Sequence, residues 1–404
     1  MSAMAARSIP LSLAAAALVG ALLFRSGLPA EAVQRPRLPG ARAVIDAAEY
    51  ASLQDALLAL PAKGGVVKLP PGEFELREPL ILEAEDVLLQ GSGTATHLIN
   101  KNTDGKPALI IRPKTYATDP RAHVWRVQVS NLQITGSDKS GHGIEAIRVN
   151  ELFIDGVSVS RNGGDGLHLN ECTEDPRIVN SLLTYNKKAG VRLLGCHDIV
   201  VSANQFEENQ DALVCADGFN LCMTDNNVDD HLRHGVVIEN TYGSVLSGNM
   251  IEECNGTAVV LDRDCYGITV SANVIAHEQE GGVDLRDAHG CAITGNSFPL
   301  VIKNAVTLSA ASGNNTIAGN TFGDSTVGTE KKIRQADQNR ASGIILQGAR
   351  GSLITGNTFG NLTQPAFEVK SAGEDTLIRG NLLRGSGGVP SGDGITADGN
   401  TVRR

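Results

Sequence analysis

Hydrophobic and polar residues follow one pattern along most of this chain, and the pattern recurs roughly every 23 residues. Each copy holds an Asn, with an apolar residue three positions before it and a bulky apolar residue two positions after it. The copies centre on Asn204, Asn226, Asn249, Asn273, Asn296, Asn320, Asn357 and Asn381, with weaker copies at Asn131, Gly156 and Asn180. Alternation of Val, Ile and Phe with polar residues favours short strands in each copy.

A second marker runs in step with the first. A Gly or Ala opens a short alternating segment at Gly143, Gly166, Gly190, Ala212, Gly235, Ala258, Gly282, Ala305, Gly343, Ala366 and Gly394. A period in the low twenties indicates one coil of a solenoid, which buries its apolar face only by stacking on its neighbours. Because the bulky positions are mostly Val, Ile and Phe, a leucine-rich repeat does not fit. The sequence therefore predicts an all-β, right-handed parallel β-helix of about 11 or more coils.

The recurring Asn suits a turn position in the left-handed backbone region, which Asn tolerates better than most residues. Stacked in successive coils, its amide can bond to the amides above and below. One interval, between Asn320 and Asn357, is longer than the others and predicts an inserted surface loop over residues 324–341.

Residues 1–32 have the features of a secretory signal peptide: Arg7, an apolar run over Leu11–Phe24 and small residues around Ala30. An uncleaved anchor is the alternative. Residues 33–63 should form an N-terminal segment whose amphipathic helix, Ala47–Leu60, caps the first coil, and residues 64–404 should form the β-helix. We therefore expect a secreted or periplasmic protein with no membrane contact beyond its export signal.

The composition restricts the partners of the chain. A net charge of −10 argues against binding to nucleic acid or to an anionic membrane surface.

Seven cysteines form no CxxC pair, although Cys172 and Cys196 lie one coil apart. They could form a disulfide or remain two stacked thiols.

The segment Gly64–Phe74 reads GGVVKLPPGEF and is followed by apolar strands at residues 79–82 and 87–93. This run resembles the opening of the pectate-lyase-like superfamily, which includes pectate lyases, polygalacturonases, and alginate epimerases and lyases. The resemblance covers nearly the whole chain after residue 32. It implies that the outer face of one sheet is a polysaccharide groove and that the partner is a polysaccharide. We also expect a monomer.

Position in the repeat predicts which side chains face that groove. The residues one and three positions after each small residue should point inward, and those two and four positions after it should point outward. The first outward row reads Glu145, His168, Arg192, Val214, Val237, Val260, Asp284, Thr307, Ile345, Glu368 and Thr396. The second reads Ile147, Asn170, Leu194, Ala216, Glu239, Asp262, Arg286, Ser309, Gln347, Lys370 and Asp398.

Two polar clusters emerge from these rows. The first, the candidate catalytic set, holds His142, Glu145, Asp165, His168, Glu171 and Arg192. His168 and Arg192 should be vertical neighbours that address one sugar. Removal of the C5 proton from a uronate requires a base and a cation that neutralises the carboxylate, which are the roles we assign to His168 and Arg192. Alginate epimerases are similar in carrying a His and an Arg on adjacent coils, but their Asp-Pro-His-Asp/Glu signature is absent here.

The second cluster holds Glu239, Asp262, Arg263, Asp264, Asp284, Arg286, Asp287 and His289. We expect Asn170, Glu239, Asp262, Asp284 and Arg286 to contact substrate. Paired carboxylates could instead perform glycoside hydrolysis through Asp262 and Asp284, bind Ca²⁺, or form a charge ladder between strands. No cofactor or dedicated metal site is predicted, and His231 with His234 should lie in a turn.

Three functions therefore remain open. The leading one is lyase or C5-epimerase chemistry on a uronate polymer. A non-catalytic carbohydrate-binding or structural β-helix is favoured by the scarcity of aromatic residues in the rows, and a glycoside hydrolase is the third.

Overall fold

The computed structural model describes residues 38–323 and 342–404. Every helix and strand described lies in one compact unit, Arg42–Arg404. The predicted signal peptide and the predicted loop at 324–341 lie outside the described residues. Within the described ranges, no helix has the length and apolar character needed to cross a membrane.

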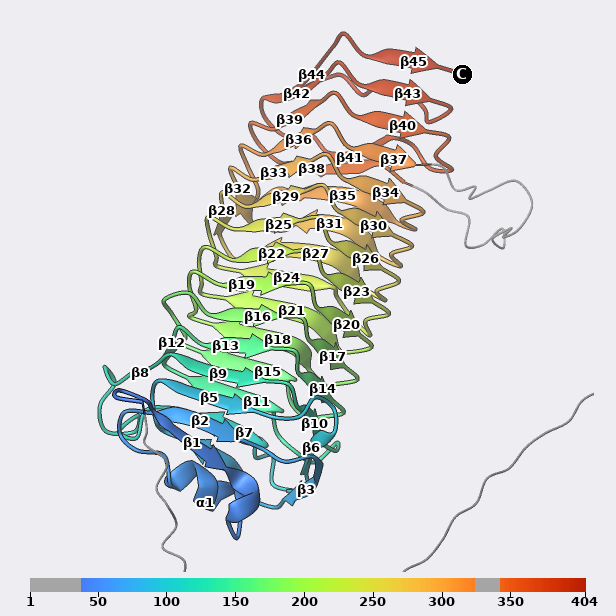
Figure 1. The fold of residues 1–404 in the computed structure, drawn as a ribbon. Helices are drawn as coiled ribbons and strands as arrows, with labels where there is room; N and C mark the ends of the chain where they lie inside the picture. The colour runs from blue at the N-terminus through green and yellow to red at the C-terminus, as the bar shows by residue number, and fades with distance from the viewer. Residues whose placement is uncertain (1–37, 324–341) are drawn as a thin grey trace, which may run out of the picture. The chain divides into compact units, whose positions relative to one another are not determined.

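The unit Arg42–Arg404 is a right-handed solenoid in which three parallel sheets, A, B and C, run the length of the stack (Figure 1). Sheet A consists of β1 (Ala43–Asp46), β2 (Gly65–Lys68), β5 (Val87–Gln90), β9 (Val127–Ser130), β13 (Phe153–Asp155), β16 (Arg177–Val179), β19 (Val200–Ser202), β22 (Cys222–Thr224), β25 (Val245–Ser247), β29 (Thr269–Ser271), β33 (Ala292–Thr294), β36 (Thr316–Ala318), β39 (Leu353–Thr355), β42 (Thr376–Arg379) and β44 (Ile395–Asp398). Its first strand, β1, precedes residue 64, where the solenoid was expected to begin.

Sheet B follows sheet A in each coil, and sheet C follows sheet B. Sheet B consists of β3 (Gly72–Leu76), β6 (Thr96–Asn100), β10 (Gln133–Thr135), β14 (Ser158–Ser160), β17 (Leu182–Thr184), β20 (Gln205–Glu207), β23 (Asn227–Asp229), β26 (Met250–Glu252), β30 (Val274–Ala276), β34 (Ser297–Pro299), β37 (Thr321–Gly323), β40 (Thr358–Gly360), β43 (Leu382–Arg384) and β45 (Thr401–Arg403). Sheet C consists of β4 (Leu80–Leu82), β7 (Leu109–Ile111), β11 (Ile144–Ile147), β15 (Leu167–Asn170), β18 (Ala189–Leu194), β21 (Asp211–Ala216), β24 (Val236–Glu239), β27 (Thr257–Asp262), β31 (Gly281–Leu285), β35 (Asn304–Ser309), β38 (Ile344–Gln347) and β41 (Phe367–Ser371). Two short pairs, β8 (Val124–Trp125) with β12 (Val149–Asn150) and β28 (Cys265–Tyr266) with β32 (Ala288–His289), extend the turns after sheet C.

The core runs along the inside of the stack. The inward positions of sheet C are fully buried, as Leu167, Val191 and Leu213 show, and these three residues are direct partners on adjacent strands. In sheet B, the Phe298, Phe322 and Phe359 rings stack at 5.0 and 4.6 Å between centroids. The predicted parallel β-helix is confirmed, because positions about two dozen residues apart are vertical neighbours that bury one another's apolar side chains.

One expected row assignment is wrong at the C-terminal end. The strand that follows Gly394, β44, pairs with β42 and therefore belongs to sheet A. Thr396 and Asp398 consequently lie outside the two outward rows of sheet C. The last strand of sheet C in the described residues is β41.

The repeated Asn side chains form a buried ladder between sheets A and B. From Asn204 to Asn381, each side-chain amide nitrogen donates to the Oδ1 of the Asn in the next coil at 2.9 to 3.0 Å. The predicted amide ladder is confirmed, but the left-handed residue is the one before it. Ala272, with φ of 55°, precedes Asn273, and Asp225, with φ of 57°, precedes Asn226.

A second buried ladder lies at the turn between sheets B and C. It starts with Asn162, Asn186 and Asn209 and continues in the next three coils as His231, Cys254 and Glu278, all of them fully or almost fully buried. Burial raises the pKa of Glu278 well above its usual value. Neither carboxyl oxygen of Glu278 has a hydrogen bond within the described part of the chain.

Glu278→Gln should make the protein less sensitive to rising pH. The unfolded chain releases the Glu278 proton near its usual pKa, 4.5, while the folded protein retains it. The contribution of Glu278 to the unfolding free energy is therefore fully present below that pH. Between that pH and the folded pKa, this contribution falls by about 1.4 kcal/mol per pH unit. In urea unfolding at about pH 5 and about pH 7, the unfolding free energy of the variant relative to the wild type should be higher at the second pH. Glu280→Gln, at an exposed position, is the control, and its unfolding free energy should depend on pH as that of the wild type does. The same pH dependence in Glu278→Gln and the wild type would contradict the prediction.

The predicted N-terminal helix is shorter than expected. A 3₁₀ turn, Ala47–Glu49, precedes α1 (Leu53–Leu58), because the Ser52 hydroxyl accepts from the Asp55 amide and caps the helix there. Gln54 bonds to both backbone groups of Ile81 in β4, at 3.1 and 2.8 Å. The helix lies at the N-terminal end of the stack (Figure 1). That it caps the first coil stays a prediction.

The cysteines are free thiols. Cys172 and Cys196 are fully buried, and each Sγ lies 3.5 Å from a backbone carbonyl of the preceding coil, that of Ala146 or Leu169. Of the two alternatives for this pair, the structure shows stacked thiols.

Candidate active site

The first predicted cluster is assembled on the outer face of sheet C. Glu145, His168 and Arg192 are direct partners on β11, β15 and β18. The sequence-based expectation that His168 and Arg192 are vertical neighbours is therefore confirmed. Their side chains are partly exposed, so a ligand on this face can reach them.

Asp165 lies beneath this row and organises it. Its side chain is only 1% exposed, and its Oδ2 lies 2.9 Å from Nδ1 of His168 and 3.1 Å from Nε of Arg192. Its Oδ1 accepts from the Ala189 amide at 2.9 Å. Burial alone would raise the pKa of Asp165, but the imidazoles of His142 and His168 and the guanidinium of Arg192 hold this pKa below its usual range. An ionised Asp165 can position its neighbours but is too buried to touch a substrate.

The hydrogen bonds assign different protonation to the two imidazoles. Nδ1–H of His168 donates to Asp165, which leaves the lone pair on Nε2. In contrast, Nδ1 of His142 accepts from the Asp165 amide at 3.0 Å, so the proton of His142 lies on Nε2. Oδ2 of Asp165 also lies 3.3 Å from Nδ1 of His142, but the backbone amide can only donate, so it takes the lone pair of Nδ1. His168 thus presents an acceptor, and His142 presents a donor.

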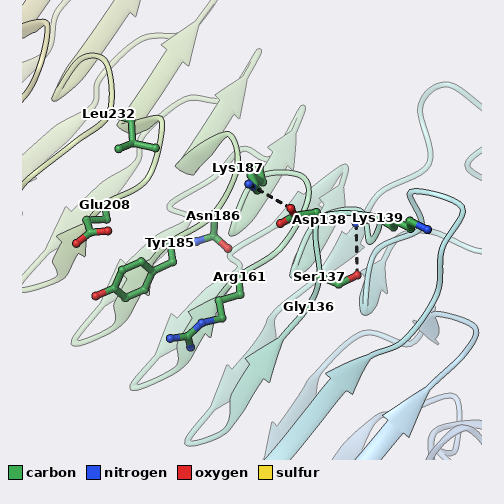
Figure 2. A pocket seen from close by; sticks show the side chains of 10 residues that line it. All are labelled: Gly136, Ser137, Asp138, Lys139, Arg161, Tyr185, Asn186, Lys187, Glu208 and Leu232. Atoms are coloured by element: carbon green, nitrogen blue, oxygen red, sulfur yellow. Dashed lines mark hydrogen bonds and ion pairs between the residues drawn. The ribbon is translucent and has the colours of Figure 1, made fainter.

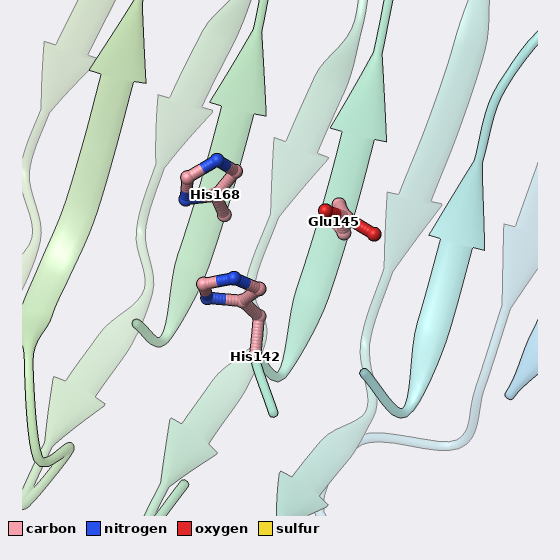
Figure 3. Close-up of side chains that lie close together, drawn as sticks. All are labelled: His142, Glu145 and His168. Carbon is pink, nitrogen blue, oxygen red and sulfur yellow. The ribbon is translucent and has the colours of Figure 1, made fainter. Parts of the chain in front are cut away.

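Figure 3 shows His142 and His168 beside each other, with Glu145 on β11, the strand that follows His142 and pairs with the strand of His168. The two rings stack with centroids 4.3 Å apart. Ligand atoms of the three residues lie within 4.8 Å of one another, close enough for a metal ion. A metal ligand needs a lone pair, however, and the Nε2 of His142 carries a proton. The arrangement therefore favours acid–base chemistry over metal binding.

Two other predicted residues lie near this cluster without joining it. Glu171 bonds to Nε of Arg148 at 2.7 Å, on the turn after β15. Asn170 occupies the second outward row between Ile147 and Leu194. It can contact a long ligand on the same face.

The second predicted cluster is a network of ion pairs between coils. Arg263 binds Glu239 at 2.9 Å. Nε of Arg286 binds Asp284 at 2.8 Å, and its Nη1 lies 4.0 Å from Asp262. Each of the three predicted carboxylates therefore lies near an arginine, which matches the charge-ladder interpretation.

The apolar strip between the two clusters is covered. Val214, Val237 and Val260 form a small buried group with Ala189 on the outer face of sheet C, and each is at most 7% exposed. Because so little of the strip is accessible, it offers almost no apolar surface on which a sugar ring could stack.

Sequence reasoning missed an aromatic stack on the turns that follow sheet C. His197, Phe219 and Tyr242 stack in successive coils, with centroids 4.7 and 5.3 Å apart. Each lies seven residues after the small residue that opens its strand, so the signal was present in the repeat. Their rings face one another, which leaves mainly ring edges at the surface.

A hollow lies on the turns between sheets B and C, outside the groove face (Figure 2). Its volume is about 670 Å³. Arg161 lies over the Tyr185 ring at 5.1 Å, and Lys187 pairs with Asp138 at 3.3 Å. No imidazole lines it, and its two carboxylates, Asp138 and Glu208, are exposed, so we place the candidate active site at His168 instead.

Comparisons with known proteins identify the fold. A family model described as right handed beta helix region matches residues 120–243, and one described as periplasmic copper-binding protein (NosD) matches residues 187–364. A comparison with curated proteins gives no match.

Solved structures with similar folds have low sequence identity. The DFA-IIIase of Arthrobacter chlorophenolicus A6 has a TM-score of 0.56 at 16% identity over 85% of this chain and 94% of its own. The mannuronan C-5 epimerase AlgE6 A-module of Azotobacter vinelandii has a TM-score of 0.50 at 15% identity, covering 89% and 99%. ORF18 of Geobacillus virus E2 has a TM-score of 0.54 at 15% identity over 78% of this chain but only 61% of the viral protein.

The residues present do not fit copper. In the described part of 187–364, the groups of three close ligating side chains are Asp264 with Asp287 and His289, and Asp229 with Asp230 and Glu253. Copper sites favour imidazole and sulfur ligands, whereas these groups are mostly carboxylates. We therefore assign no copper site.

The three stacked sheets, the buried ladders and the matched model agree with one another. Taken together, they establish the chain as a right-handed parallel β-helix repeat protein.

Proposed function

We propose that this protein acts on an acidic polysaccharide as a lyase, with His168 as the base and Arg192 as the group that neutralises the substrate carboxylate. One observation carries the proposal: the buried Asp165 binds both Nδ1 of His168 and Nε of Arg192, so a lone pair and a cation are fixed side by side. Arg192 binds Asp165 through Nε, and its terminal nitrogens have no hydrogen bond within the described part of the chain.

In the proposed reaction, Nε2 of His168 removes the C5 proton of a uronate unit, and negative charge moves onto the carboxylate that faces Arg192. The bond from C4 to the glycosidic oxygen breaks and a C4–C5 double bond forms. The His168 imidazolium then returns its proton to the leaving oxygen. The Nε2–H of His142 can donate a hydrogen bond to that oxygen.

The same geometry favours elimination over epimerisation. His142 and His168 stack on the outer face of sheet C, so both address one face of a bound sugar. Inversion at C5 requires a proton from the opposite face. The mannuronan C-5 epimerase of similar fold supports uronate chemistry on this scaffold, but the stacked pair supports a lyase.

The proposal extends to location and partners. Residues 1–32 would export the protein, which would meet its polymer as a monomer outside the cytoplasm. Glycoside hydrolysis by Asp262 and Asp284 is less well supported, because Arg286 already binds Asp284 and lies close to Asp262.

Purified protein incubated with alginate or polygalacturonate should generate unsaturated ends, detected by the ultraviolet absorbance of the new double bond. Binding without unsaturated products would favour the non-catalytic module. Saturated fragments would favour the hydrolase, and inverted C5 centres in the polymer, read by NMR, would favour the epimerase.

A further inference from the structure

A second histidine repeats the local structure of His142. His234, four strands further along sheet C, also directly precedes the small residue that opens its strand. Its Nδ1 accepts from the Thr257 amide at 3.0 Å, just as Nδ1 of His142 accepts from the Asp165 amide at 3.0 Å. His234 therefore also presents an Nε2–H donor.

Glycines in the next coil make room for both imidazoles. A Cβ added to Gly164 would lie 2.8 Å from Nδ1 of His142, and a Cβ added to Gly256 would lie 2.5 Å from Nδ1 of His234. Only glycine lets the next coil approach a ring this closely. The two sites thus share a backbone requirement as well as a hydrogen bond.

His234 borders a cavity of about 320 Å³ on the same face as His168. Asp284, Arg286 and Thr307 also line it, and Asp284 and Thr307 continue the outward row that contains His168. Arg286 binds Asp284 through Nε at 2.8 Å, as Arg192 binds Asp165 through Nε. In both sites an arginine lies two coils after a histidine that presents an Nε2–H donor.

The site at His234 has no counterpart of His168, the proposed base. In the coil after His234, Val260 occupies the row position that His168 occupies in the coil after His142, and Thr257 stands where Asp165 stands. Val260 is almost fully buried and cannot accept a proton. The cavity therefore lacks the histidine base of the proposed reaction but keeps the donor imidazole and the cation that can bind a sugar unit.

We propose that the cavity lined by His234, Asp284 and Arg286 is a distal binding subsite for another unit of the same acidic polysaccharide. Arg286 would face the carboxylate of that unit, while His234, Asp284 and Thr307 would bind its hydroxyls. Four strand steps separate the two sites, which is roughly 19 Å. If one sugar unit spans about one strand spacing, a chain of roughly five units reaches both sites. This inference rests on the proposed function.

The test is a series of oligouronates from dimer to octamer, with turnover as the first readout. For the wild type, KM should fall by roughly tenfold or more once the chain reaches both sites, since an additional charge-assisted contact adds binding, while kcat stays flat. Arg286→Ala and His234→Ala should bring the ratio of short-chain to long-chain KM close to one. Arg77→Ala, an exposed arginine near the N-terminus, should leave this ratio as in the wild type.

Calorimetric binding of the same oligomers separates this inference from the proposed function. If no oligomer is turned over but long chains bind more tightly than short ones, and Arg286→Ala removes the difference, the subsite stands and the lyase proposal falls. Affinity and KM that do not depend on length would overturn the subsite. So would an Arg286→Ala variant that folds, by thermal unfolding, and keeps the wild-type ratio.

Discussion

His168→Ala should lower turnover of a uronate polymer by about 10²- to 10⁴-fold, the range usual for loss of a positioned general base. Nε2 of His168 carries the lone pair that removes the C5 proton, and the neighbouring His142 presents a proton instead. The initial rate of unsaturated product formation gives kcat, and calorimetry gives affinity for the polymer. We expect kcat to fall far more than affinity.

His97→Ala is the matched control. His97 is a partly buried histidine bonded to Thr135 on sheet B, away from the groove face, so its loss should leave turnover unchanged. His168→Ala should still fold but unfold at a lower temperature than the wild type, because the buried Asp165 loses one hydrogen-bond partner and keeps Arg192 and the Ala189 amide. Turnover at the wild-type rate in a folded His168→Ala protein would remove His168 from the mechanism.

Asn273→Ala should have the largest effect on stability, about 3–5 kcal/mol. The side chain of Asn273 accepts from both the backbone and the side-chain nitrogen of Asn249, and it donates to the Leu246 carbonyl and to Asn296. All of these groups are buried, and alanine leaves several without partners. The expected result is a large fall in the midpoint of urea unfolding.

Asn227→Ala serves as the comparison, because Asn227 bonds to Gln205 on the partly exposed face of sheet B. We expect less than about 0.5 kcal/mol there. Equal effects at the two positions would show that the ladder contributes no more than an ordinary surface contact. A solenoid can also open locally, so the exchange of amide hydrogens in the coils next to Asn273 should accelerate most.

Most of the fold could be predicted because two periodic markers kept the same phase across the chain. Burial alternates in a strand, so the small residue that opens each strand was enough to identify Leu167 and Val191 as core and His168 and Arg192 as surface. The error at Gly394 has the same origin. A Gly before an alternating segment marks a strand but does not say which sheet the strand joins.

The sequence prediction placed the left-handed residue of each turn one position too late, at the ladder Asn itself. Asn often adopts positive φ, so the repeated Asn was expected to make the turn itself. In the structure Asp225, Ala272 and their equivalents make it, and the Asn side chain points inward. The weaker copies at Asn131 and Asn180 do adopt positive φ, because they align with the turn residue rather than with the ladder.

The site was predicted as a set of neighbours but not as a mechanism. Spacing gave the vertical pairing of His168 with Arg192. It could not reveal that Asp165 is buried and binds both, because a residue before the strand has no fixed direction in the repeat. The tautomers of His142 and His168 also depend on individual hydrogen bonds, which no periodic pattern encodes.

Asn320 donates to Asn357 at 3.0 Å across 37 positions, the same distance as between Asn296 and Asn320, which are 24 positions apart. The hydrogen bond between these two coils thus does not change with the length of the chain between β37 and β38. A foreign peptide or a small folded module spliced in at this point would leave the neighbouring coils in register. The molecule therefore offers a natural attachment point for cargo well beyond the coils that carry His168.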